Sequence, residues 1–98
     1  MSKIRESAKG ENCAIRIPGI CNHNAETVVL AHYRLAGTCG IGMKPNDCQA
    51  AYSCSNCHDA VDGRLKTGLS ADELKVAFAE GVMRTQQILI KLGLVVSK

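Results

Sequence analysis

The apolar and polar positions of this chain predict a short mixture of strands and helices. Residues 27–33, Thr-Val-Val-Leu-Ala-His-Tyr, are rich in β-branched and aromatic residues, which favours a strand. Residues 48–53 predict a second short strand. Residues 36–47 lie between them, with three glycines and one proline, and predict a long loop. The two strands could therefore pair as a hairpin around this loop.

The N-terminal part is less regular. Residues 1–12 are polar and predict an arm or a short first helix. Apolar side chains then alternate at Cys13, Ile15 and Ile17, which favours a strand. Pro18-Gly19 is a strong turn signal, and this turn would bring Cys21 back toward Cys13.

Two helical patterns complete the chain. From Ser55 or Asn56, either of which could cap a helix, apolar residues recur every four positions at Cys57, Val61 and Leu65. Gly68 is expected to end this unit.

A long amphipathic helix is expected over residues 70–93. Ser70 and Glu73 have the spacing of a capping box, and Gly93 is a plausible stop. We expect its apolar stripe to pack on the strands, although a dimer face is an alternative. The stripe consists of Leu74, Ala77, Phe78, Val82, Thr85, Ile88, Leu89 and Leu92.

Length and composition indicate that the hydrophobic core alone gives this chain limited stability. The chain has 98 residues, so we expect one domain over 1–98, with a core over 13–66 and the long helix over 70–93. Such a short domain has a limited core, and this one has only three aromatic residues. The six cysteines are the obvious further source of stability.

The cellular compartment decides between disulfides and metal ligation. The polar start of the chain carries no apolar secretory segment, and no run is long enough to span a membrane. We therefore expect a cytoplasmic protein without a membrane partner, where clustered cysteines more often bind metal. The net charge of +3 favours an anionic partner such as DNA only slightly.

The cysteine spacing predicts a structural Zn²⁺ site. Cys54 and Cys57 form a Cys-x-x-Cys knuckle, the spacing that lets two thiolates reach one tetrahedral metal. Cys13 and Cys21 flank the predicted turn and can present a second pair, with a wider spacing than usual. Four thiolates would make a closed site whose metal stabilises the fold.

Other roles for these residues stay open. The knuckle could be a redox pair, or with His58 a haem-attachment motif, but no parallel βαβ framework or export signal supports either one. Cys39 and Cys48 are expected to be ordinary small residues. Cys39 and His23 are possible substitute zinc ligands.

His32 at a strand end and His58 after the knuckle bring the sequence close to a known family. A strand ending in His, a glycine-rich loop, a second strand and Cys-x-x-Cys-His opening a helix resemble the HNH endonuclease module, the ββα-metal fold. Over nearly the whole chain the sequence is similar to the small prophage-encoded YbcO-like nucleases. The strings that carry this similarity are Cys21-Asn, Leu30-Ala-His32, Lys44-Pro45, Ser55-Asn-Cys57-His58-Asp59 and Gly81-Val-Met-Arg-Thr-Gln86.

The resemblance implies an α+β, zinc-stapled ββα-metal fold and hydrolysis of DNA phosphodiester bonds. His32 matches the general base that activates water, and imidazole suits this task because it changes protonation between pH 5 and 8. His58 matches the residue that helps hold a catalytic Mg²⁺ or Mn²⁺. Arg34 and Lys44 could bind neighbouring phosphates.

The middle residue departs from the family pattern. HNH sequences carry an Asn five or six residues before the knuckle, where this chain has Gln49 and Cys48. The nearest candidates are Asn46 and Asp47, which could orient His32, and Asp47 could instead bind the catalytic metal. A non-catalytic zinc module that binds DNA or a recombination or replication protein is the alternative function.

Overall fold

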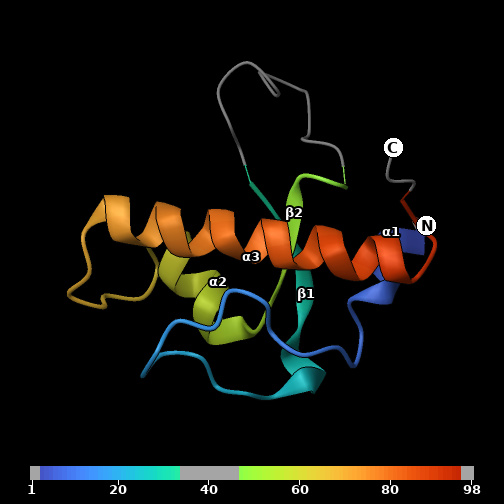
Figure 1. Cartoon of the computed structure of the whole chain (residues 1–98). Helices are drawn as coiled ribbons and strands as arrows, with labels where there is room; N and C mark the ends of the chain where they lie inside the picture. The colour runs from blue at the N-terminus through green and yellow to red at the C-terminus, as the bar shows by residue number, and fades with distance from the viewer. Residues whose placement is uncertain (1–2, 34–46, 96–98) are drawn as a thin grey trace, which may run out of the picture.

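A computed structural model describes residues 3–33 and 47–95 of the chain, and Figure 1 shows the arrangement of its elements. It is a small α+β fold with a two-stranded sheet and a long C-terminal helix. The elements in chain order are α1 (Lys3–Ser7), the 3-10 helix η1 (Ala25–Thr27), β1 (Val29–His32), β2 (Ala50–Ser53), α2 (Ser55–Val61) and α3 (Ala71–Lys91).

The two predicted strands are present and pair antiparallel, as expected of a hairpin. The register runs from Val29 opposite Ser53 to His32 opposite Ala50. Both strands are shorter than predicted, because Thr27 belongs to η1 and Cys48 to a turn. Most of the predicted loop over 36–47 lies outside the described residues.

Helix α3 packs along β2 and crosses the strands in Figure 1. The predicted capping box is confirmed, since Ser70 accepts from the Glu73 N–H and Glu73 accepts from the Ser70 N–H. Gly93, at φ +77°, follows the helix, and the N–H groups of Gly93 and Leu94 close a Schellman motif on Ile90 and Leu89. The start and the stop of this helix were therefore both encoded locally.

The strand β2 is buried on all sides, which explains its small residues. Ala50, Ala51 and Tyr52 have no exposed surface. Gly81 of α3 lies so close to the N-terminal segment that a Cβ there would be 2.7 Å from Cγ1 of Ile15 and 3.3 Å from Cβ of Ala51. The absence of a side chain at Gly81 thus lets α3 approach the sheet closely.

The segment after α1 is not a strand, contrary to the prediction from Cys13, Ile15 and Ile17. Arg16 has φ +55°, a left-handed conformation that interrupts an extended chain. A single bond, from the Ala14 N–H to the Tyr52 carbonyl at 2.8 Å, joins this segment to the outer edge of β2. The predicted turn is present at residues 18–20.

Three predictions at helix ends were also wrong. The N-cap of α2 is Cys54, whose sulfur accepts from the Cys57 N–H, rather than Ser55 or Asn56. The helix ends at Val61, so Leu65 lies beyond it and is 40% exposed. At the other end, Leu92 caps α3 and is 51% exposed, so it does not belong to the buried stripe.

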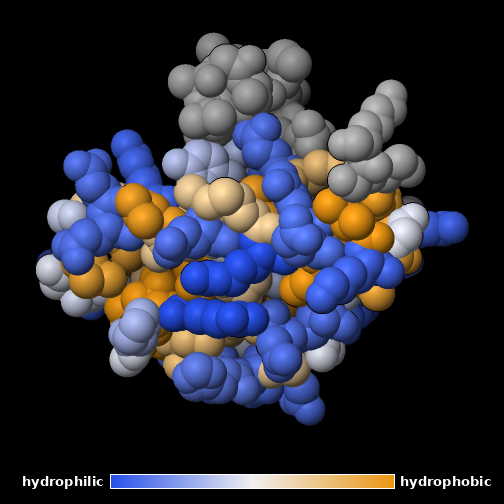
Figure 2. All heavy atoms as spheres, in the orientation of Figure 1, coloured by the Kyte–Doolittle hydropathy of each residue, from blue (hydrophilic) through white to orange (hydrophobic). Residues whose placement is uncertain are grey.

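The outer surface over α3 mixes hydrophilic and hydrophobic residues, as Figure 2 shows. Apolar side chains exposed on this helix include Val76 and Met83. Within residues 3–33 and 47–95, no helix has the length and apolar character needed to cross a membrane.

Candidate functional site

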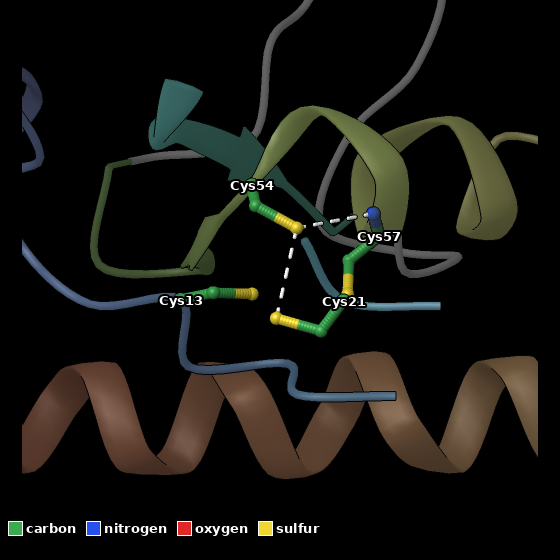
Figure 3. Close-up of side chains that lie close together, drawn as sticks. All are labelled: Cys13, Cys21, Cys54 and Cys57. Carbon is green, nitrogen blue, oxygen red and sulfur yellow. Dashed lines mark hydrogen bonds between the residues drawn. The ribbon is translucent and has the colours of Figure 1, made fainter. Parts of the chain in front are cut away.

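Four cysteine side chains converge beside the sheet. Cys13 follows α1 and Cys21 follows the turn at residues 18–20. Cys54 lies between β2 and α2, and Cys57 lies in the first turn of α2. Their sulfur atoms all lie within 4.8 Å of one another and point toward a common centre (Figure 3). All but Cys21 are buried. This cluster could hold a metal ion, and its members are the four predicted ligands.

The sulfur separations fit a tetrahedral zinc ion. Zn–S bonds of about 2.3 Å place the sulfurs of a regular tetrahedron about 3.8 Å apart. The sulfurs of Cys21 and Cys54 are separated by 3.8 Å. Four cysteines would leave no open coordination position, so the metal would stabilise the fold rather than bind substrate.

The electrostatics of the cluster favour a bound cation. A hydrogen bond with Cys57 lowers the pKa of Cys13 to about 4, against the opposing effect of burial. Burial raises the pKa of Cys21 to about 11, and the bond with Cys13 raises the pKa of Cys57. One thiolate is therefore favoured at Cys13 while further negative charge is disfavoured, and a divalent cation would supply the compensating charge.

His32 lies at the end of β1, next to Asp47. The Nε2 atom of His32 is 2.8 Å from Oδ1 of Asp47, and both side chains are about one-fifth exposed. An ionised carboxylate only accepts hydrogen bonds, so Nε2 carries the hydrogen of this contact. In the neutral ring Nδ1 is then the unprotonated nitrogen and can accept a proton.

His58 forms a second pair on α2. Its Nε2 lies 3.3 Å from Oδ2 of Asp62, one helical turn later, and Arg64 donates to the same carboxylate at 3.0 Å. Asp62 also lines an open pocket of about 220 Å³ together with His32. Sequence analysis missed Asp62, although a helical His and Asp four residues apart share one face and could have indicated it.

The predicted site residues are only partly brought together. The structure pairs His32 with Asp47 and His58 with Asp62. In the described part of the chain, the four cysteines are the one group of three or more close His, Cys, Asp or Glu ligand atoms. A divalent metal shared by His58 and Asp47 therefore stays a prediction. Three predicted residues (Arg34, Lys44 and Asn46) and the alternative ligand Cys39 lie outside the described residues.

The second alternative ligand lies at the edge of the cluster. Nδ1 of His23 is 3.8 Å from the sulfur of Cys21, and His23 has φ +54°. Cys48 is not a member of the cluster.

Comparison with known proteins identifies the family. The family model "Putative nuclease YbcO" matches residues 2–94. The chain belongs to the YbcO family. The "Putative nuclease YbcO" of Escherichia coli K12 is 47% identical over 95 residues, which cover 97% of this chain and 98% of that protein. The YbcO protein of Enterobacteria phage 82, "Putative nuclease ybcO", has the same identity and coverage.

A solved structure extends this similarity from sequence to fold. "Structure of a putative bacteriophage protein from Escherichia coli str. K-12 substr. MG1655" matches with a TM-score of 0.79 and 43% identity. The match covers 93% of this chain and 100% of that one. The fold described here is thus shared with that protein.

Proposed function

We propose that this protein is a metal-dependent endonuclease of the HNH type that hydrolyses DNA phosphodiester bonds. The nuclease names of its relatives support the general activity. The observation that carries the specific mechanism is the 2.8 Å contact between His32 and Asp47 at the end of β1.

His32 acts as the general base. Asp47 fixes the ring through Nε2, so Nδ1 takes a proton from a water molecule as its oxygen attacks the phosphorus atom. The P–O bond to the leaving strand end then breaks. Asp47 takes the orienting place that Asn has in the family pattern, and Asn46 stays the other candidate.

His58, with Asp62 beside it, is the proposed place of the catalytic Mg²⁺ or Mn²⁺. When bound, such an ion stabilises negative charge on the phosphate and on the leaving oxygen. The pairing of Asp62 with Arg64 partly neutralises the carboxylate, so Arg64 competes with the ion for it. The four cysteines, as a structural Zn²⁺ site, hold the start of α2 and with it His58.

Nicking of supercoiled plasmid and cleavage of single-stranded DNA in Mg²⁺ or Mn²⁺ test this proposal. We expect His32→Gln to lower the rate by about 100-fold or more, the range of general base catalysis, with unchanged zinc content. His58→Ala should weaken binding of the divalent ion, so the rate should fall and the Mg²⁺ or Mn²⁺ concentration needed for half-maximal activity should rise. Lys91→Gln, an exposed change in the last turn of α3, is the control and should keep the wild-type rate.

Two results would contradict the mechanism. One is a His32→Gln variant as active as the wild type. The other is a folded, zinc-loaded wild type that is inert with both ions on both substrates, which would favour a non-catalytic zinc module.

A further inference from the structure

The pocket beside His32 has an unusual lining for this chain. It has a volume of about 220 Å³ and is lined by His32, Tyr33, Val61, Asp62, Lys75 and Phe78. These residues come from the end of β1, the end of α2 and the first half of α3. The pocket thus adjoins the proposed general base and reaches the long helix, which the HNH module itself does not include.

Aromatic side chains are concentrated in this pocket. The chain has two Tyr, one Phe and no Trp. Tyr52 is fully buried in the core, whereas Tyr33 and Phe78 both line the pocket. Their rings meet edge to face, with centroids 5.0 Å apart and planes at 65°. Both rings also pack on the core but remain partly exposed, so they can present surface to a ligand.

Lys75 gives the pocket its positive charge. It is the one Lys or Arg among the described lining residues, and Asp62 lines the same pocket. No ion pair within 4.0 Å involves Lys75 in the part of the chain that the structure describes. An exposed ammonium group next to aromatic surface is suited to a phosphate that accompanies a base.

We propose that this pocket holds an unpaired nucleotide of the substrate, which makes single-stranded DNA the preferred substrate; this inference rests on the proposed nuclease function. Tyr33 and Phe78 contact the base or sugar, and Lys75 contacts an adjacent phosphate. Bases in a duplex are stacked on their neighbours and cannot offer their faces to a side pocket, whereas an unpaired base can. Stacking tolerates every base, so little sequence preference is expected.

Binding without cleavage tests the inference separately from the chemistry. Fluorescence anisotropy of a labelled mixed-sequence 12-mer, single-stranded or annealed to its complement, is measured on zinc-loaded protein without added divalent ion. We expect tighter binding of the single strand. Phe78→Leu and Tyr33→Leu, which keep apolar packing, should each weaken it about 5- to 100-fold.

Lys75→Gln is the second arm, on an exposed residue whose change does not threaten folding. It should weaken single-strand binding and lower the slope of log affinity against log salt by about 0.7, the effect of one phosphate contact. The matched control is Lys91→Gln, near the other end of the same helix, which should leave the slope unchanged.

Equal or tighter binding of the duplex would overturn the inference. Phe78→Leu and Tyr33→Leu variants that lose thermal stability but bind the single strand normally would also overturn it, because the rings would then contribute only to core packing. Single-strand binding as expected without any cleavage in Mg²⁺ or Mn²⁺ would support the pocket and contradict the proposed catalytic function instead.

Discussion

Thr85 joins α3 to the sheet through its hydroxyl group. The side chain is fully buried, accepts a hydrogen bond from the Tyr52 N–H at 3.0 Å, and donates one to the Gly81 carbonyl at 2.8 Å. The Tyr52 N–H points away from β1, so Thr85 satisfies a donor on the outer edge of β2 that water cannot reach. Thr85→Val removes this acceptor while keeping the shape of the side chain.

The expected cost follows from the buried donor. A buried N–H group without an acceptor costs about 1–3 kcal/mol. No cavity term is added because Val has nearly the volume of Thr, and the helix propensities of the two residues are similar. We therefore expect a loss of about 2 kcal/mol in the free energy of unfolding. For a domain of this size, that loss lowers Tm by roughly 8–16 °C.

Urea denaturation at a fixed zinc concentration measures this loss, with Thr85→Ser as the matched control. Ser keeps the hydroxyl and loses one methyl group, which costs about 0.8 kcal/mol of apolar burial. The predicted order of stability is wild type, then Thr85→Ser, then Thr85→Val, with similar m-values. A Val variant as stable as the wild type, or more stable than the Ser variant, would refute the role assigned to the hydroxyl.

Two further predictions concern α3. Gly81→Ala places a Cβ 3.1 Å from the Cα of Ile15. Overpacking that costs about 1–3 kcal/mol should outweigh the gain of about 1 kcal/mol in helix propensity, so the variant should be less stable in urea. An Ala variant with a higher urea midpoint would show that the helix can move away. Ser70→Ala removes the capping box and should cost about 1 kcal/mol in the same assay; an unchanged midpoint would contradict this.

Local signals carried much of the fold. The β-branched run before His32 and the capping box at Ser70 depend on neighbouring residues alone. The run predicted β1, although the strand begins only at Val29, and the capping box predicted the start of α3. The four members of the cysteine cluster could be predicted from two local signals, the Cys-x-x-Cys spacing and the turn at Pro18-Gly19.

The misassigned segment shows where local patterns fail. Apolar alternation at Cys13, Ile15 and Ile17 reflects burial beneath α3 and around the cysteine cluster, not an extended chain. The left-handed Arg16 lies where the chain bends so that its backbone N–H approaches the sulfur of Cys13. Cys13 is buried there because it lies against Cys54 and Cys57, which are 41 and 44 positions away, so this bend cannot be deduced from the local pattern.

The pocket beside His32 was equally beyond sequence analysis. Tyr33 and Phe78 are 45 positions apart, and only the packing of α3 on the sheet brings them together. Helical spacing from His58 could have indicated Asp62. It could not have indicated Lys75, because the pocket residues His32, Tyr33 and Asp62 lie outside α3.

In the proposed account, one metal ion bound by the cysteine cluster would stabilise both the fold and the proposed site. Elemental analysis of freshly purified protein tests this directly, with Cys48→Ser as control because Cys48 is outside the cluster. We predict about one zinc per chain in the wild type and in Cys48→Ser, and its loss in Cys54→Ser. A folded wild-type protein without stoichiometric metal would contradict the assignment.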